Sequence, residues 1–287
     1  MKHCRTENKI DCTVLVSVKN EEKNIAQCLN ALLDFEKVIV IDSYSSDNTK
    51  EICKKFGVDV LDFDYQPPYP KKRQWALDNV KMKTAWVLLL DADELIGNNL
   101  RDELRELHRS PKLQGIFITK NFYFLGKRLR FGGFDFKALL MFRLGAAKFE
   151  EISFSDNGLD MEIHERLLLN GETVSTQFGL EHLDWNSFTH YIGKHNNYSS
   201  WEADVRTRVQ GEKAVQPKLF GNIQERRRFL KKIVQTLPFE PVIWFLYHYI
   251  FRLGLLDGRR GLTAAVTRSF YIFMVRTKII EKRFRGE

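Results

Sequence analysis

The chain has 287 residues, of which 44% are hydrophobic, so it can form one large α/β domain with an appendage and a real core. This composition excludes a chain that is disordered throughout. The formal net charge of +8 at pH 7 and a pI near 9.2 favour an anionic partner, such as a nucleotide, a nucleic acid or an acidic membrane surface.

The cysteines argue against two kinds of site. All of them lie in the first 53 residues (Cys4, Cys12, Cys28 and Cys53), and none has Cys-x-x-Cys spacing. We therefore expect reduced thiols in a cytosolic compartment, with neither a zinc site nor a disulfide framework. Residues 1–7 lack the apolar stretch of a signal peptide, and we expect none.

Predicted strands and helices alternate up to residue 90. This alternation predicts a mostly parallel sheet flanked by helices, with right-handed crossovers and a ligand site at the carboxyl ends of the strands. The expected strands are 13–18, 38–41, 58–61 and 86–90. The expected helices are one carrying Ile25, Cys28, Leu29 and Leu32, one capped by Ser46 or Asp47 that runs to Phe56, and one at 71–80.

Shorter alternating segments follow between residues 115 and 180. They predict mixed or antiparallel strands that extend the sheet, at 116–118, 122–124, 139–142 and 173–174. Gly126–Phe136 is rich in Arg, Gly and Phe, and we expect a surface loop there. Residues 186–210 predict a helix that carries aromatic side chains.

The C-terminal region is basic and aromatic. Residues 242–251 and 262–280 are apolar, but a transmembrane helix needs ~20 nearly uncharged residues, so neither segment qualifies. Basic amphipathic helices in a membrane interface fit better, and helices packed on the first domain or on another subunit are the alternative. We expect a first domain at 1–215 and a membrane-associating helical region at 216–287.

The most informative motif is Val87–Glu94, Val-Leu-Leu-Leu-Asp-Ala-Asp-Glu. It predicts a buried strand that ends in a site, where a turn can bring Asp91 and Asp93 toward one small volume. Two carboxylates repel unless a cation lies between them. Hard oxygen ligands suit Mg²⁺ or Mn²⁺, which then hold a diphosphate. The alternative is a loop whose acids cap a helix starting near Gly97.

Several short segments follow one another in a particular order along the chain. Each lies at the end of a predicted strand or at the start of a predicted helix. They are Val14–Glu21, Val38–Ser43, Ser46–Thr49, Lys72–Leu77 and Leu90–Glu94. Together they resemble the family 2 glycosyltransferases, which are inverting enzymes with a Rossmann-like GT-A fold, and the resemblance covers about residues 12–185. His164–Leu167 and the tail Leu253–Gly258 with Gly261 and Leu262 are similar to the lipopolysaccharide-core β-glucosyltransferases.

The resemblance implies a divalent-metal site at the acidic motif. Asp93 is expected to ligate Mg²⁺ or Mn²⁺ directly, and Asp91 to face the ribose or to share the ion. His182 matches a histidine that often completes the metal shell in related enzymes, although a lone histidine is usually structural. The ion would act as Lewis acid and template for the departing nucleotide diphosphate.

The donor site is expected beside the metal. Asp42 can accept a hydrogen bond from the imide N–H of uracil, which favours a UDP-sugar, and a turn aspartate is the alternative. Asn20 and Glu21 match the segment that holds the nucleoside, with a helix-start carboxylate as the alternative. Arg73 can pair with phosphate or sugar, or lie on a solvated basic face. Ser43 follows Asp42 where the commoner family pattern has a second acid.

An inverting displacement also needs a base that takes the proton of the acceptor hydroxyl. The segment Met161–Glu165 offers two carboxylates, Glu162 and Glu165, and Glu165 matches the usual family position better. A salt bridge to Arg166 is the alternative role for Glu165, and Glu162 could face out of an edge strand.

The loop Lys127–Phe134 could cover the donor or receive the acceptor. Phe131 and Phe134 could stack on a sugar, and Arg128 and Arg130 could meet a phosphate on a core sugar or lipid head group. A plain surface hairpin is the alternative.

These features predict a metal-dependent inverting transferase that moves a hexose, with glucose favoured, from a UDP-sugar to a lipopolysaccharide-core or other membrane-associated glycan. We expect a peripheral enzyme at the cytoplasmic side of the bacterial inner membrane, without a nucleic-acid partner. A sugar-phosphate nucleotidyltransferase is one alternative, but Lys19–Glu22 is not the Gly-rich loop of such enzymes. A non-enzymatic module that binds anionic lipid or nucleic acid would leave the acids at three strand ends without a role.

Overall fold

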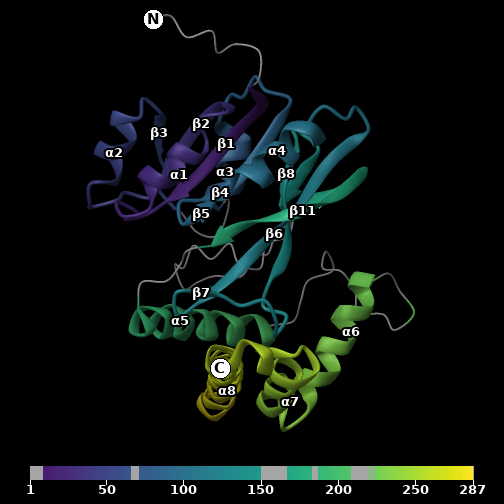
Figure 1. Cartoon of the computed structure of the whole chain (residues 1–287). Helices are drawn as coiled ribbons and strands as arrows, with labels where there is room; N and C mark the ends of the chain where they lie inside the picture. The colour runs from purple at the N-terminus through teal and green to yellow at the C-terminus, as the bar shows by residue number, and fades with distance from the viewer. Residues whose placement is uncertain are drawn as a thin grey trace, which may run out of the picture. The chain divides into compact units, whose positions relative to one another are not determined.

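The computed structural model describes residues 9–65, 71–149, 167–182, 187–207, 220 and 223–286. The chain divides into two compact units (Figure 1). The first comprises Met1–Asn121 and Asp135–Asp184, and the second comprises Phe122–Phe134 and Trp185–Glu287. Each unit has its own hydrophobic core.

Parallel strands form the first half of the sheet in the first unit. β1 pairs in parallel with both β2 and β4, and β2 pairs in parallel with β3, as the sequence predicts. Leu15 packs on one face of β1, while Val14 and Val16 pack on the other. Burial on both faces explains the near-continuous apolar runs. The order across the sheet is β3 (Asp59–Asp62), β2 (Phe35–Asp42), β1 (Ile10–Val18) and β4 (Trp86–Asp91).

Helices cover both faces of these strands. The helices α1, α2 and α4 contribute to the core on one face, and α3 packs Ala76 into the core on the other. The Asp47 carboxylate accepts a hydrogen bond from the Thr49 amide at 3.0 Å, so Asp47 satisfies a donor at the start of α2. The ranges are α1 (Ile25–Ala31), α2 (Thr49–Lys55), α3 (Lys72–Asn79) and α4 (Asn98–Leu107).

Antiparallel strands complete the sheet, as expected. β8 pairs with β4, β6 with β8, and β5 with β11, all antiparallel. The two segments expected at 116–118 and 122–124 belong to one strand, β6. The ranges are β5 (Glu94–Leu95), β6 (Leu113–Phe124), β8 (Phe136–Arg143) and β11 (Glu172–His182), with β9 (Ala147–Phe149) and β10 (Leu167–Leu169) in a separate pair. This architecture confirms the predicted α/β class.

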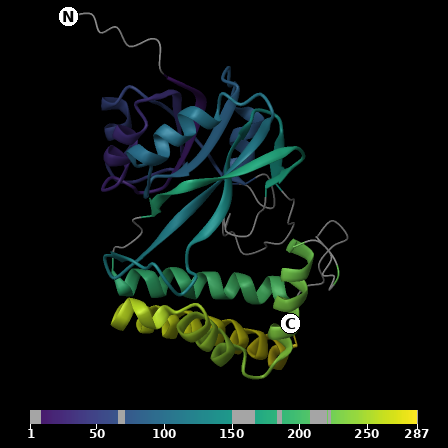
Figure 2. The same ribbon diagram turned by 45° about the vertical axis from the view of Figure 1, so that its right-hand side comes forward.

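Helices dominate the second unit. α5 and α8 run alongside each other (Figure 2), and their core contains Ala203 from α5 with Tyr271, Ile272 and Val275 from α8. Because α5 packs on α8, α5 belongs to the second unit, and the expected boundary at residue 216 stays a prediction. The helices are α5 (Phe188–Thr207), α6 (Ile223–Thr236), α7 (Glu240–Leu246), a π-helical turn (Tyr247–Phe251), a 3₁₀ helix (Gly254–Asp257) and α8 (Gly258–Arg285). Of the helices that the structure describes, none is long and apolar enough to cross a bilayer.

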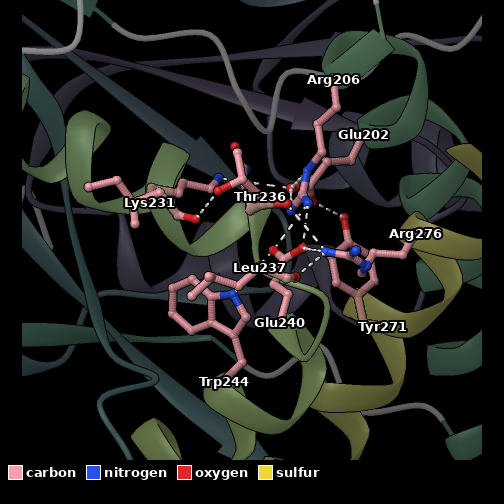
Figure 3. A network of polar contacts seen from close by, with 11 residues as sticks. Glu202, Arg206, Lys231, Thr236, Leu237, Glu240, Trp244, Tyr271 and Arg276 are labelled. Atoms are coloured by element: carbon pink, nitrogen blue, oxygen red, sulfur yellow. Dashed lines mark hydrogen bonds and ion pairs between the residues drawn. The ribbon is translucent and has the colours of Figure 1, made fainter.

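A network of buried charges joins α5, α7 and α8 (Figure 3). Arg206 donates to Glu202 Oε1 at 2.7 Å and to both carboxylate oxygens of Glu240 at 3.1 Å. The Tyr271 hydroxyl donates to Glu202 Oε2 at 2.6 Å, and Arg276 donates to Glu240 Oε2 at 3.4 Å. Since both carboxylates are buried, removing one cation would leave a buried charge uncompensated.

We predict that Glu202 makes the stability of the helical unit depend on acid pH. Burial acts to raise the pKa of Glu202, but Arg206, Lys231 and the Tyr271 hydroxyl lower it from 4.5 to about 2. A lowered folded-state pKa gives stability that is present above 4.5 and is lost as pH falls toward 2. Glu202→Gln should flatten this dependence in thermal unfolding followed by circular dichroism. It should also lower the free energy of unfolding at neutral pH by roughly 3 kcal/mol.

The matched control is Glu281→Gln, which removes an exposed carboxylate from a surface pair with Arg285. It should unfold as the wild type does at every pH. If Glu202→Gln kept the wild-type slope between pH 4.5 and 2, the buried network would have no part in acid stability.

Candidate active site

The strand register brings two predicted acids to one edge of the sheet. Val18 lies opposite Asp42 on β2, and Ser17 lies opposite Asp91 on β4. Because neighbouring strands lie about 4.8 Å apart, the backbones of Asp42 and Asp91 are separated by roughly 10 Å. This edge is formed by the carboxyl ends of parallel strands, where open α/β sheets bind their ligands.

Asp91 lies in a dense cluster of charges. Arg73 Nη2 on α3 donates to Asp91 Oδ1 at 2.6 Å, and Lys120 Nζ on β6 lies 3.8 Å from Asp91 Oδ2. Lys120 also forms an ion pair with Glu94, and Glu94 Oε2 accepts a hydrogen bond from the Asp91 amide at 3.1 Å. Glu94 is 1% exposed and Lys120 is 7% exposed. The cluster therefore fixes the Asp91 carboxylate and compensates for its charge.

Asp93 is the second acid of the motif and is partly buried. Among the residues that the structure describes, no group of three or more His, Cys, Asp or Glu side chains is arranged to hold a metal ion. The donor set nevertheless fits Mg²⁺ or Mn²⁺, because one or two carboxylates usually hold such an ion and water or substrate phosphate completes its shell. His182 lies opposite Glu94 in the β11–β5 pair, so its backbone is next to the motif.

Asp42 at the C-terminal end of β2 is buried, and its carboxylate accepts hydrogen bonds from the turn that follows the strand. Asp42 Oδ2 accepts a hydrogen bond from the Ser45 amide at 2.8 Å, and the Ser45 hydroxyl donates to Asp42 Oδ1. Lys50 Nζ lies 3.4 Å from Asp42 Oδ2 and 2.6 Å from Asp62. These contacts match the turn role that the sequence left open as the alternative, and the uracil contact stays a prediction.

Asn20 joins the loops that follow β1 and β2. Its backbone has a φ of 57°, and its Oδ1 accepts hydrogen bonds from the Ser46 amide at 2.8 Å and from the Ser46 hydroxyl at 3.3 Å. Glu21 accepts a hydrogen bond from Asn24 Nδ2 at 2.8 Å, just before α1. Both residues therefore organise the site edge, and their contacts with a nucleoside stay predictions.

The catalytic-base candidates Glu162 and Glu165, together with His164, lie outside the described residues. The assignment of the base therefore remains a prediction from the sequence. The His182 side chain also lies outside the described part of the chain, so its place in a metal shell is a prediction too.

Sequence reasoning missed Lys120 and Glu94 as site residues. Glu94 ends the acidic motif, and its buried position follows from its pairing in β5, so the motif carried a signal for it. Lys120 carried no local signal, since only the long β6 strand brings it to Asp91. Lys72 is also buried, and its Nζ donates to the Val18 carbonyl at 3.2 Å, which supports the end of β1.

The cysteines that the structure describes are core residues. Cys12, Cys28 and Cys53 are free and buried, and Cys28 Sγ lies 4.0 Å from the Asp91 carbonyl. Burial raises the pKa of all three thiols, and for Cys53 the Asp42 charge adds to this, so that its pKa is about 11. Such thiols stay protonated and pack as small apolar groups.

The fold and the charges together define the class of site. Acids at the carboxyl edge of a parallel sheet, with the Arg73 guanidinium on one of them, suit an enzyme that binds a nucleotide through its phosphates.

Comparisons with known proteins show which family and relatives the chain resembles. Residues 13–145 match the model of Glycosyl transferase family 2. The lipopolysaccharide core biosynthesis glycosyltransferase LpsC of Rhizobium meliloti (strain 1021) is 26% identical over 287 residues, which are 96% of this chain and 93% of that protein. The uncharacterized glycosyltransferase RT0209 of Rickettsia typhi is 24% identical, covering 94% of this chain and 86% of that protein.

A solved structure is similar along most of the chain. The mannosyltransferase PcManGT from Pyrobaculum calidifontis, in complex with GDP-Man and Mn2+, gives a TM-score of 0.48 at 14% identity, covering 96% of this chain and 88% of that chain.

Residues 13–145 therefore carry a glycosyl transferase family 2 domain, and the comparisons support a glycosyltransferase. The matched residues include β1, β2 and β4, whose carboxyl ends form the charged site edge. This match favours glycosyl transfer over the nucleotidyltransferase and the non-enzymatic binding module.

We predict that Lys120 is required to compensate for the buried Glu94 carboxylate. Lys120→Met should lower the free energy of unfolding by about 3 kcal/mol, because the buried Glu94 carboxylate loses its ion pair with Lys120. The double variant Lys120→Met/Glu94→Gln should recover most of the loss, which chemical denaturation of all variants would measure as a double-mutant cycle. Lys112→Met, which removes an exposed lysine, is the control and should be neutral. Additive losses in the cycle would contradict the pairing.

Proposed function

We propose that the protein is a metal-dependent inverting glycosyltransferase that moves a hexose, with glucose favoured, from a UDP-sugar to a lipopolysaccharide-core or other membrane-associated glycan. We place it at the cytoplasmic side of the bacterial inner membrane as a peripheral enzyme. The acceptor class is supported by the similarity along nearly the whole chain to a protein named as a lipopolysaccharide core biosynthesis glycosyltransferase.

The observation that carries the proposal is the pairing of Asp91 with Arg73 at the end of β4. It places a guanidinium beside the acidic motif, where a diphosphate held through a metal would lie. A guanidinium can share its donors between a carboxylate and a phosphate, because it presents several N–H groups in one plane. Arg73 would therefore orient the diphosphate while it remains bonded to Asp91.

The metal would be held by Asp93, with Asp91 and His182 beside it. When bound, Mg²⁺ or Mn²⁺ supplies a Lewis acid that stabilises the negative charge of the leaving diphosphate. Lys120 and Glu94 keep the Asp91 carboxylate in place, so the geometry of the edge is formed before the donor arrives.

The donor nucleoside would lie toward the turn that follows β2. The roughly 10 Å between Asp42 and Asp91 matches a nucleoside at one strand end and its diphosphate at the other. The resemblance implies uracil as the base. A uracil imide would reach Asp42 by replacing one of the hydrogen bonds from Ser45.

The proton of the acceptor hydroxyl would pass to a carboxylate of the Met161–Glu165 segment. An inverting displacement forms the new glycosidic bond as the bond to the diphosphate breaks, so one base is sufficient. Glu165 is the favoured base, and Glu162 is the alternative.

Asp93→Ala tests the metal site directly. Turnover of labelled UDP-glucose on lipopolysaccharide-core acceptor should fall by at least 100-fold, because the leaving group loses its metal. Thermal unfolding should stay close to wild type, since Asp93 is only partly buried. Asp102→Ala, an exposed carboxylate on α4, is the control. Unchanged turnover of Asp93→Ala at saturating Mn²⁺ would end the metal assignment.

Glu165→Gln and Glu162→Gln identify the base. The substitution of the true base should lower kcat by about 100-fold or more and leave UDP binding intact, because only proton transfer is lost. The other substitution should have little effect on kcat. Full activity of both variants would place the base elsewhere in the chain.

A further inference from the structure

The tail motif Leu253–Gly258 has a structural role within the second unit. Leu253 has a φ of 58°, and Gly258 has a φ of 62°, so the chain turns at both ends of the 3₁₀ helix. A Cβ on Gly261 would lie 1.9 Å from the Gly254 carbonyl oxygen, and a Cβ on Gly254 would lie 2.7 Å from the His248 carbonyl oxygen. The glycines therefore allow this turn to pack closely against the start of α8.

This turn holds the loop that precedes Phe134. The Asp257 carboxylate accepts hydrogen bonds from the Arg130 amide at 3.2 Å and from the Phe131 amide at 2.9 Å. The Gly132 amide donates to the Arg252 carbonyl at 2.8 Å. Two segments far apart in the sequence thus lie side by side through backbone hydrogen bonds.

His248 fixes the same loop from a second direction. Its Nδ1 lies 2.7 Å from the Gly132 carbonyl oxygen, which only accepts, so Nδ1 carries the hydrogen. Its ring stacks on Phe134 at 4.7 Å and 10°. Burial lowers the pKa of His248, and the charges of Arg268 and Arg252 act in the same direction, although the Gly132 hydrogen bond acts to raise it. The neutral His248 ring therefore keeps its hydrogen bond to Gly132 and its stacking on Phe134.

The joined segments, 125–131 and 250–260, make one exposed surface that we name the basic face. The Asp257 carboxylate is the one acid in these two segments, and both of its oxygens are used by backbone amides. The exposed cations of the basic face are Lys127, Arg128, Arg130, Arg252, Arg259 and Arg260.

Large apolar side chains are exposed among these cations. Phe251 is 77% exposed and Leu256 is 56% exposed. The apolar exposure continues along the 28-residue helix α8 at intervals of three or four residues over much of its length, which places these residues along one side of the helix. They are Leu262, Val266, Phe270, Phe273, Ile280 and Phe284. The opposite side of α8 is already used, since Tyr271, Ile272 and Val275 are buried in the core with α5.

We propose that the basic face and the exposed apolar side of α8 dock on the surface of an anionic phospholipid membrane. This deepens the proposed function, on which it rests for the membrane location of the acceptor. Cations mixed with exposed Phe and Leu are the composition of segments that lie in a lipid interface. A protein interface would be depleted of charge at its centre, and a nucleic-acid surface would have no use for a long aliphatic and aromatic side.

The loop is what distinguishes this surface from a simple amphipathic tail. Lys127, Arg128 and Arg130 lie outside the C-terminal region, and the Asp257 and His248 contacts bring them into the basic face. The acceptor-loop candidate of the sequence would therefore meet lipid or glycolipid phosphate at the membrane surface.

Deleting the C-terminal region would not test this proposal. α8 supplies the core of the helical unit and its buried charge network, so a truncated chain would lose its fold. Surface substitutions in the full-length chain are needed instead.

The test is flotation of the full-length protein with vesicles. Wild type should bind vesicles of phosphatidylcholine with phosphatidylglycerol, and should bind phosphatidylcholine vesicles weakly or not at all. Arg252→Gln/Arg259→Gln/Arg260→Gln should weaken binding to the anionic vesicles by about tenfold or more, because each cation near the lipid surface adds to the attraction. Raising the salt concentration should weaken wild-type binding in the same way.

Two further variants separate the contribution of the cations to vesicle binding from that of apolar insertion into the lipid. Phe251→Ser/Leu256→Ser should weaken binding while it keeps the salt dependence, because the cations remain. Lys54→Gln/Lys55→Gln/Arg109→Gln removes the same number of exposed cations from the first unit and should bind vesicles as wild type does.

The outcomes distinguish failure of the membrane-docking proposal from failure of the proposed function. UDP binding with Mn²⁺, measured on the same samples, should be equal for wild type and all surface variants. Absence of wild-type vesicle binding, or wild-type binding by the triple arginine variant, would overturn the membrane surface, whatever the UDP result. If the wild type bound no vesicles but formed a dimer, and the triple arginine variant were monomeric, this face would be assigned to contact with a second copy of the chain. Failure of UDP binding alone would instead overturn the proposed function.

Discussion

The parallel pairing of β1 with β2 and β4 is the constraint on which the site depends. The register sets Asp42 opposite Val18 and Asp91 opposite Ser17. Two acids from distant parts of the sequence therefore lie at the same edge of the sheet. A slip of one residue would move the side chains of each core cluster to the opposite face of the sheet, so the specific packing of both clusters holds this register. The spacing of these two acids therefore follows from strand pairing alone.

Charge compensation is the second constraint, and it appears in both units. At the site, Lys120 and Arg73 lie against Glu94 and Asp91, and in the helical unit Arg206 lies against Glu202 and Glu240. Buried pairs of this kind add little net stability, but each partner becomes costly to lose. Such pairs make the orientation of the acids specific, as the proposed binding of a diphosphate and a cation would require.

Local patterns explain how much could be predicted from the sequence. Apolar runs and short-range contacts such as that of Asp47 with the Thr49 amide act over a few residues, so the parallel strands and their helices could be predicted. The role of Lys120 depends on a long-range pairing through β6, and the fixing of Ser46 by Asn20 depends on a left-handed backbone at Asn20. Neither has a local signal. The packing of α5 on α8 likewise depends on contacts that are visible only in three dimensions.

The central claim is that this charged edge binds a nucleoside diphosphate through a divalent metal. Isothermal calorimetry of the wild-type protein with UDP and with GDP, each with and without Mn²⁺, tests it most directly. The account predicts saturable binding of UDP that requires Mn²⁺, with weak or no binding of GDP. Preference for GDP would contradict uracil as the base, and no binding of either nucleotide with Mn²⁺ would contradict the assignment of the site.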